Sequence, residues 1–579
     1  MSIEQATNPS VIAAPRPMGS EVRIATDAAK RVAVCAGLLA LLMVWPVIFP
    51  QTGDGDAIMH YLNAHDSLWQ PAKLMGSWAR VGAKIPLLIP AQFGVLGARW
   101  AAAVISIVCA WQTIRLADDL KIRRSILAAA FLIFQPFVFT LAGDTMTELP
   151  FALGMVVAIR LRLAGRLLAS CLVMGYLPTV RPEGFFLCAM WAAMVIANRR
   201  PILVVALGWG VVAWFVACLI LRGDPTYFFR QGWSWPADSL RAYGHGSFFS
   251  HVNRWPIYCG PVLLPLFLLG LCKSALPIGS PMGEGLVTAV EDHTAGKPAG
   301  YTGRLSRHRW VRYLLLGGIA LVILEVLLPP GGIGHTVLPW PALLLIGLIA
   351  WAVRRWKFAI GVWVFLLIFT LHTVLWWRGW FGSCGLMRIL ACVAPITAIA
   401  CLNGWNLIAD QMPGMLRAGV IAGAVVTAMV YYIVDPRHQR IFPLQRACQF
   451  VARHDLLRDA PMIIFGDPMA QAALNLPPNP PNLLPNDCDR AREYAHLLHA
   501  PLGSVGLWDN QHAQAWFGVS ISDLSALGYT ILFQTQRRPP LSIEWLEPAN
   551  PPRDQVYVVI RKDRPGRMAA ASSSPALGL

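Results

Sequence analysis

Charged residues are scarce in this sequence. Only 14% of its 579 residues are Asp, Glu, Lys or Arg, while 56% are hydrophobic and the mean hydropathy is +0.52. Soluble domains carry about a quarter charged residues and are much less apolar. The composition therefore predicts a polytopic membrane protein rather than a soluble one.

Acidic residues are fewer than basic ones, and the formal net charge is +17. Such an excess can indicate nucleic-acid binding. Here, however, the basic residues cluster in short loops between apolar runs, which is the positive-inside pattern of membrane proteins. We therefore expect no nucleic-acid partner.

The twelve cysteines lack the spacing of a metal site, since the sequence contains no C-x-x-C and no Cys/His cluster. Most lie in apolar runs, and we interpret them as packing residues. Cys448 and Cys488 fall in the C-terminal tail and could form a disulfide if the tail is exported.

Apolar runs near the length that a bilayer needs predict about thirteen transmembrane helices. They lie at about 32–50, 95–115, 124–142, 148–164, 166–181, 185–198, 201–222, 256–273, 312–329, 336–353, 357–377, 388–406 and 417–434. Residues 1–31 read as a disordered cytosolic segment, and the first apolar run as an uncleaved helix because it exceeds a signal-peptide core. No internal repeat is apparent, which weighs against a transporter built from inverted halves.

Basic residues alternate between loops. With the N-terminus inside, the inside loops include 121–124 and 354–357, which are rich in Lys and Arg, whereas the outside loops at 143–147 and 329–335 have neither. This orientation places the 51–94 loop and the tail outside. Because no outer segment carries an N-x-S/T site, the bacterial cytoplasmic membrane is favoured over the endoplasmic reticulum.

The tail alternates short apolar runs with polar segments. The runs lie at 461–465, 503–508, 529–533 and 556–560, with a helix-like stretch at 490–499. This pattern predicts a small extracytoplasmic α/β domain over 435–565, followed by a disordered tail over 566–579.

Two carboxylates, Asp54 and Asp56, lie beside glycines just after the first span. A charge at the membrane surface is costly unless it is solvated or used, and partial burial raises a carboxyl pKa toward that of a general base. We interpret the pair as candidate catalytic residues. A helix-ending turn and a D-x-D site for a divalent cation stay open as alternatives.

Two further outer segments carry charge. Asp144 and Glu148 are four residues apart, which puts both carboxylates on one face at a helix start; a capping box formed by Thr145 and Glu148 is the alternative. Arg181 and Glu183 belong to an Arg-Pro-Glu-Gly turn. There an outside arginine departs from the charge bias, and a salt bridge to Glu183 is the alternative to a functional role.

Arg388 opens the twelfth predicted span. An arginine at an outer helix start opposes both the charge bias and the helix dipole, so an anion should compensate it. A phosphate suits a guanidinium because it accepts two parallel hydrogen bonds. A carboxylate from another loop is the alternative.

Aromatic residues gather in the 223–255 loop, together with His245 and His251. We interpret them as interfacial anchors, with sugar or lipid stacking as the alternative. His60 and His65, near the aspartates, are interpreted as turn or surface residues.

Together these motifs resemble the GT-C superfamily of integral-membrane glycosyltransferases, which includes the protein O-mannosyltransferases and the aminoarabinose transferases of lipid A. The likeness covers most of 32–434. It consists of Asp54-Gly-Asp56, the acidic loop with Asp144 and Glu148, the Arg-Pro-Glu-Gly turn at 181–184, and a Gly-Ser-x-Gly-x-x-Arg entry to a late helix at 382–388. The mannosyltransferases have an Asp-Glu pair where this chain has Asp-Gly-Asp, so either aspartate could be the base.

The resemblance implies a GT-C-like catalytic domain over 32–434 that transfers a sugar, with inversion, from a polyprenyl-phosphate donor to a lipid, glycan or protein acceptor on the outer face. Asp54 or Asp56 would deprotonate the acceptor, and Arg388 with Arg181 would bind the carrier phosphate. Asp144 and Glu148 would orient sugar or acceptor, and Glu183 is grouped with these substrate-binding residues. No cofactor is required by the resemblance, and a divalent metal stays open.

Three rival functions remain. A transporter or flippase of lipid-linked or anionic substrates predicts acids near span centres and paired broken helices, whereas the acids here lie at outer helix ends. A non-catalytic membrane subunit predicts that neutralising Asp54, Asp56 and Arg388 has little effect. A ligase that moves a whole glycan from a lipid diphosphate is the related enzymatic alternative.

Overall fold

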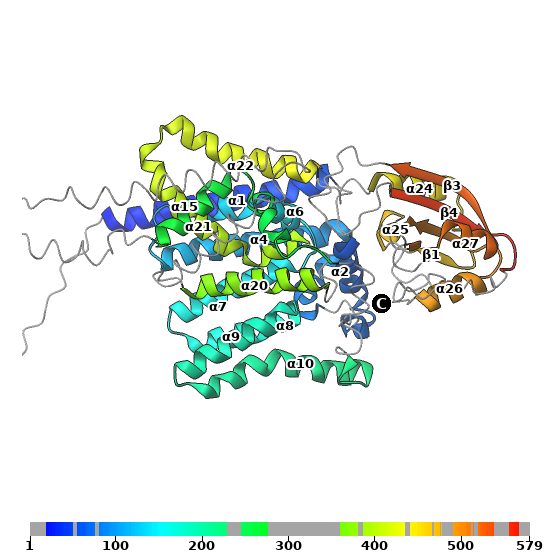
Figure 1. The fold of residues 1–579 in the computed structure, drawn as a ribbon, viewed down its shortest axis with the longest axis horizontal. Helices are drawn as coiled ribbons and strands as arrows, with labels where there is room; N and C mark the ends of the chain where they lie inside the picture. The colour runs from blue at the N-terminus through cyan, green and yellow to red at the C-terminus, as the bar shows by residue number, and fades with distance from the viewer. Residues whose placement is uncertain are drawn as a thin grey trace, which may run out of the picture.

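The computed structural model describes residues 19–49, 55–75, 80–227, 245–275, 359–379, 386–434, 441–465, 468–474, 476, 490–510, 513–514, 519–537 and 555–566. The described chain is mostly helical, with one small sheet near the C-terminus (Figure 1). Asp54, Cys488 and the predicted spans at 312–329 and 336–353 lie outside these residues.

Six described helices are long and apolar enough to cross a membrane. They are built on α1 (Gly19–Ile48), α4 (Gly94–Asp119), α10 (Val204–Arg222), α20 (Ala359–Arg378), α21 (Ala394–Ile408) and α22 (Gly414–Val434). A bent pair would make a seventh span; it joins α13 (Ser250–Asn253) and α14 (Trp255–Cys259) to α15 (Leu263–Ala275) at 115°. The chain is an integral, multi-pass membrane protein.

Three shorter apolar helices follow one another between these spans. They are α7 (Glu148–Leu163), α8 (Leu167–Val180) and α9 (Glu183–Ala197). With 14 to 16 residues each, they are about 21–24 Å long, less than the hydrocarbon thickness of about 30 Å. Polar residues lie at their ends: Glu148 begins α7, Arg181 follows α8 and Glu183 begins α9.

The run at 124–142 forms two helices, where the sequence predicts one. It divides into α5 (Leu127–Ile133) and α6 (Pro136–Ala142). Pro136 provides no N–H and excludes a helical conformation before it, so Gln135 is extended, with φ −68° and ψ 129°. The Gln135 side chain donates to the carbonyl oxygens of Phe131 at 2.9 Å and Ala394 at 3.0 Å, which ties the break to α21.

The segment at 51–94, which the sequence predicts to be an outside loop, contains helices. Its described part holds α2 (Gly55–Asp66), η1 (Pro71–Met75), α3 (Val81–Lys84), η2 (Ile85–Leu87) and η3 (Pro90–Phe93). These helices are too short and polar to appear as spans. Figure 1 shows α2 at the end of the helical body that faces the sheet.

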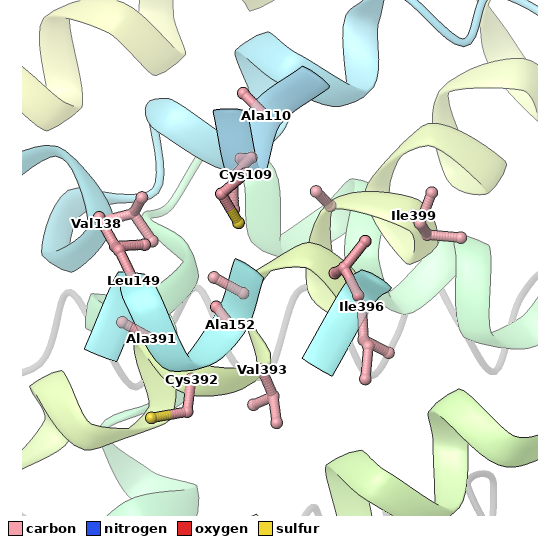
Figure 2. Packing of buried hydrophobic residues seen from close by; sticks show 14 of the residues in the cluster. Cys109, Ala110, Val138, Leu149, Ala152, Ala391, Cys392, Val393, Ile396 and Ile399 are labelled. Carbon is pink, nitrogen blue, oxygen red and sulfur yellow. The ribbon is translucent and has the colours of Figure 1, made fainter. Parts of the chain in front are cut away.

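A continuous apolar core fixes the ends of α7 and of η6 (Met387–Val393) against each other. Leu149 and Ala152 of α7 are buried with Ala391, Cys392 and Val393 of η6, as Figure 2 shows. The described cysteines of the helical body are mostly buried there as well, as the sequence predicts. Because interiors are close-packed, this core holds the residues that precede it, Glu148 and Arg388, in fixed places.

The C-terminal region forms a four-stranded mixed sheet in the order β1-β2-β4-β3. Its strands are β1 (Ile463–Phe465), β2 (Val505–Asp509), β3 (Tyr529–Arg537) and β4 (Gln555–Lys562). The β1–β2 pair is parallel, and β2–β4 and β3–β4 are antiparallel. The strands coincide with the four predicted apolar runs, and the coarse prediction of a helical membrane protein with a small C-terminal mixed sheet is confirmed.

Helices pack on both faces of this sheet. One face is covered by α24 (Ile441–Arg453), which buries Leu444, Ala447, Cys448 and Val451 at helical spacing. Leu497 of α26 (Arg490–His499) and Leu524 of α27 (Ile521–Ala526) are buried with the opposite face. The short helix α25 (Pro468–Ala473) packs against α2, so the sheet region contacts the end of the helical body that carries α2.

Candidate active site

Five of the charged side chains that the sequence singles out lie at element ends on one side of the helical body. Asp56 is in the first turn of α2, Glu148 is the first residue of α7, and Glu183 is the first residue of α9. Arg181 follows α8 as its C-cap, and Arg388 is the second residue of η6. The structure brings all five into one set of ionic contacts.

Asp56 and Arg388 form the outermost of these contacts. The Asp56 carboxylate makes a salt bridge with the Arg388 guanidinium. The arginine side chain is 7% exposed and the aspartate 27%, so the carboxylate reaches solvent while the cation is buried. The predicted alternative, in which a carboxylate compensates Arg388, is therefore present in this structure.

Arg181 joins two deeper carboxylates. Its Nη1 lies 2.9 Å from Glu148 Oε1, and its Nη2 donates to Glu183 Oε1 at 2.8 Å. Nη1 also donates to Thr147 Oγ1 at 2.8 Å. The salt bridge to Glu183 that the sequence left as an alternative is present.

Glu148 connects the two arginines. Its Oε1 faces Arg181 and lies 3.9 Å from Arg388 Nε. At the other end of the set, His372 Nε2 of α20 lies 3.1 Å from Glu183 Oε1. We call this series the paired network; it runs in the order His372, Glu183, Arg181, Glu148, Arg388 and Asp56.

The capping box suggested by Thr145 and Glu148 is not formed. The N-cap residue of α7 is Thr147, and no side chain caps it. Thr145 instead donates its hydroxyl to Ala57 O of α2 at 2.5 Å. A charge-assisted contact with Arg181 is stronger than a local hydrogen bond to a backbone N–H, so the distant partner determines where Glu148 lies.

Asp144 lies in the loop that supports α2. It is 7% exposed, and its Oδ1 accepts the backbone N–H of Thr145 at 3.0 Å. Buried Arg99 of α4 donates its Nε to Gly143 O at 2.8 Å. This loop is therefore held from α4 on one side and α2 on the other.

Two basic residues near the site were missed by the sequence reasoning. Lys84 ends α3 and has no exposed surface, and Arg80 immediately precedes that helix. Tyr176 of α8 fixes α3 by donating its hydroxyl to Gly82 O at 2.6 Å. The positive-inside rule contained a signal for them, because basic residues are unexpected in a segment that is predicted to lie outside.

His60 is buried, with 3% exposed, so its interpretation as a turn or surface residue was wrong. Burial lowers the pKa of His60 well below its usual range, and positive charges around it lower the pKa further. These charges belong to Lys84, Arg80, Arg181 and Arg388. His60 therefore reports a cation-rich environment and stays neutral at neutral pH.

Four cations lie around His60 in the middle of α2. The four cations around His60 compare with Asp56, Glu148 and Glu183 as the carboxylates joined to Arg388 and Arg181. Such a group of cations suits an anionic ligand, and phosphate, like carboxylate, accepts two parallel hydrogen bonds from a guanidinium.

A divalent-cation site is not assembled by the described residues, which contain no group of three or more His, Cys, Asp or Glu side chains arranged for metal binding. Asp54, the other member of the D-x-D pair, lies outside the described ranges. The structure thus gives no set of ligands from which to assign a metal.

No family model matches the chain, and no curated protein matches it. Among solved structures, the chain is similar to ArnT from Cupriavidus metallidurans in the apo state, with 13% identity over 92% of this chain and 98% of that one and a TM-score of 0.41. It is also similar to ArnT from the same organism bound to undecaprenyl phosphate, with 14% identity over 93% and 98% of the two chains and a TM-score of 0.40. The likeness thus extends over nearly the whole chain at low sequence identity.

Proposed function

We propose that this protein transfers a sugar from a polyprenyl-phosphate carrier to an acceptor on the extracytoplasmic face of the membrane, with inversion at the anomeric carbon. The observation that carries the proposal is the salt bridge between solvent-reaching Asp56 and buried Arg388, within a cation-rich end of a membrane helix bundle. It combines a candidate base with a candidate phosphate site.

The reaction needs a base for the acceptor. An acceptor hydroxyl would give its proton to the carboxylate of Asp56 or Asp54, and its oxygen would form a bond with the anomeric carbon. The bond between that carbon and the phosphate oxygen breaks, and polyprenyl phosphate leaves. Asp56 is the most exposed carboxylate of the paired network, which suits a group that must meet an acceptor.

The leaving phosphate needs positive charge. Arg388 and Lys84 are buried near α2, where their charges are weakly screened and stabilise a developing phosphate anion strongly. Nucleotide sugars are cytosolic, so a transferase on the outer face needs a lipid carrier. A basic anchor at the membrane surface fits such a donor.

Donor binding would also prepare the base. A carboxylate that neutralises an arginine is a poor proton acceptor while that contact lasts. A donor phosphate that binds Arg388 with two hydrogen bonds would compete with Asp56 for the guanidinium. Asp56 would then be free to accept the proton after the donor has bound.

The deeper residues take positioning roles in this proposal. Arg181 is already held by Glu148, Glu183 and Thr147, so we assign it to fixing these carboxylates rather than to contacting phosphate. Glu148 in turn positions Arg388. Asp144, in the loop that holds α2, would orient α2 and the acceptor.

We retain the proposed topology and domain limits. The N-terminus lies in the cytoplasm, about thirteen spans occupy 32–434, and residues 435–565 form an extracytoplasmic domain. The starts of α2, α7 and α9 then share the outer face with the sheet. This arrangement puts the acids at helix ends rather than at span centres, which the enzyme requires and a transporter does not.

The test is an assay of purified protein in nanodiscs with undecaprenyl phosphate carrying mannose, glucose or aminoarabinose, with acceptor extract, and with either EDTA or Mg²⁺. Free undecaprenyl phosphate is followed by mass spectrometry. We expect release by wild type and its loss in Arg388→Ala and in one of Asp54→Asn and Asp56→Asn. The aspartate whose replacement abolishes release is the base.

Asp118→Asn is the matched control. Asp118 is 27% exposed and salt-bridged to Arg31 at 2.6 Å, much as Asp56 is to Arg388. However, it lies at the C-terminal end of α4, whereas the N-terminal part of α4 holds the Asp144 loop through Arg99. Its replacement should leave release unchanged. No release by wild type under any condition would favour the transporter, and release that survives all three site variants would refute the site.

A further inference from the structure

A second group of buried polar side chains lies beside the paired network. We call it the α13–α20 cluster; it comprises His251, Arg254, Thr373 and Trp376. Within the described part of the chain, these side chains have buried atoms with no hydrogen-bond partner, namely both ring nitrogens of His251, Arg254 Nη1, Thr373 Oγ1 and Trp376 Nε1. His251 and Trp376 are 1% exposed and Thr373 is 4% exposed.

Helix geometry explains why these groups meet. Phe369, Thr373 and Trp376 recur at i, i+4 and i+7 along α20, so they share one face of that helix. The His251 ring lies 6.4 Å from the Phe369 ring, centroid to centroid, and α13 packs against α20. The cluster therefore belongs to the contact between these two helices.

The cluster adjoins the candidate active site through one residue. His372, next to Thr373 on α20, reaches Glu183 of the paired network at 3.1 Å. His251 lies within electrostatic range of His372 and of Arg254. A ligand in contact with the cluster would therefore lie one side chain away from the Arg181 and Glu148 contacts.

The chemistry of the cluster selects its ligand. Several buried polar atoms without partners are costly unless a ligand supplies the missing hydrogen bonds, and an apolar ligand cannot do so. A phosphate would be drawn instead to the surroundings of His60, where four cations lie, whereas the cluster has one cation, Arg254. Hydroxyl, imidazole and indole groups beside the aromatic rings of Phe369 and Trp376, with the Arg254 guanidinium as a further donor, suit a ring that carries hydroxyl groups.

We propose that the α13–α20 cluster binds the sugar ring of the donor while the cations around α2 hold its phosphate. This inference rests on the proposed function and assigns the residues that select the sugar. Thr373 and His251 are then specificity residues that bind substrate, and Arg388 and Lys84 are not needed for sugar preference.

The experiment compares the affinity of the full-length protein in nanodiscs for undecaprenyl phosphate and for the same lipid carrying each sugar of the panel. Thr373→Val keeps the side-chain shape and removes the hydroxyl. We expect it to reduce the preference for the loaded lipid about tenfold, the value of one hydrogen bond. Binding of bare undecaprenyl phosphate and the midpoint of thermal unfolding should not change.

Thr113→Val is the matched control. Thr113 is also fully buried, but its hydroxyl donates to Cys109 O at 2.8 Å within α4. This variant should unfold at a lower temperature and keep the sugar preference. His251→Phe provides a second test if Thr373→Val does not fold, and Thr373→Ser should restore the preference.

Retention of the wild-type preference by both Thr373→Val and His251→Phe would overturn the inference and leave the cluster filled by water only. The inference would also be overturned if wild type bound undecaprenyl phosphate but showed no preference for the same lipid carrying any sugar of the panel. Release of undecaprenyl phosphate in the transfer assay would then still support the proposed function. Failure of both binding and release would refute both.

Discussion

The paired network and the α13–α20 cluster are neighbouring groups of buried polar side chains, but they satisfy their polar atoms differently. In the first, arginines and carboxylates alternate and compensate one another in charge, although Glu148 Oε2 and His372 Nδ1 also lack a hydrogen-bond partner among the described residues. In the second, hydrogen-bonding atoms lack partners among the described residues. Each unsatisfied buried group costs about 1–3 kcal/mol. Our proposal assigns the first group an arrangement set by its own salt bridges, and the second a ligand that supplies its missing hydrogen bonds.

The largest expected effect is that of replacing Asp56, the residue of the paired network that reaches solvent. Asp56→Asn should lower the rate of transfer by about 100- to 10,000-fold if Asp56 is the base. It should at the same time tighten binding of undecaprenyl phosphate, because Arg388 loses a competing carboxylate. Both quantities are measured on the same nanodisc preparation.

Weaker lipid binding in Asp56→Asn would contradict the exchange of Arg388 between Asp56 and phosphate. Asp118→Asn, which removes a salt bridge at the other end of α4, should change neither quantity.

The second effect is on the free energy of unfolding, which should fall when the paired network is changed but not when the α13–α20 cluster is changed. Glu183→Gln removes one of the two carboxylates that compensate Arg181, both partners being mostly buried. Loss of one partner of a buried ion pair should lower the free energy of unfolding by roughly 3 kcal/mol, whereas Thr373→Val should leave it unchanged. Thermal unfolding of purified protein gives both values.

A surface ion pair provides the reference for Glu183→Gln. Arg561 and Asp563 in the sheet region are 44% and 30% exposed and 2.8 Å apart. Asp563→Asn should cost less than about 1 kcal/mol. An equally small loss in Glu183→Gln would mean that the paired network does not stabilise the fold.

The sequence predicted the parts of this molecule that depend on long apolar runs. The six long apolar helices among the described residues coincide with predicted spans because about 20 apolar residues leave few other structures. The charge bias along the same runs predicted that Asp56, Glu148, Arg181, Glu183 and Arg388 lie at helix ends on one face, and in the structure these side chains meet.

Pairing within the site could not be predicted, because it depends on contacts between distant segments. Arg388 was expected to meet phosphate or a carboxylate. The packing of α7 against η6 places Glu148 beside it, and Asp56 reaches it from α2. Local signals misled where long-range partners exist: the capping box suggested at Thr145 is absent, while one forms at Ser520 and Asp523 of α27. Lys84 and His60 were missed because burial is not visible in a short polar segment.

The third effect depends on pH. The pKa of His60 is lowered by burial and by the cations of the site, whereas in the unfolded chain the pKa is about 6.5. Below that pH the unfolded state binds a proton that the folded state does not, so the stability contributed by neutral His60 is lost as pH falls. The loss should be about 1.4 kcal/mol for each pH unit below about 6.5.

His60→Gln isolates this contribution. Thermal unfolding of wild type and variant is compared at pH 7.5 and 5.5. The drop between the two pH values should be smaller in the variant, and an equal drop would show that His60 takes up a proton in the folded protein.

The smallest expected effect compares two threonines, one from each region. Thr145 donates to Ala57 O at 2.5 Å and links the Asp144 loop to α2, whereas Thr373 has no partner among the described residues. Thr145→Val should cost about 1 kcal/mol because the buried hydrogen bond between the Thr145 hydroxyl and Ala57 O is lost, and it should raise KM for the acceptor because α2 carries Asp56. Thr373→Val should change sugar preference without this loss of stability. If both variants lose the same stability, the two regions are equally satisfied in the free protein, and the distinction between an organised network and a ligand-completed cluster fails.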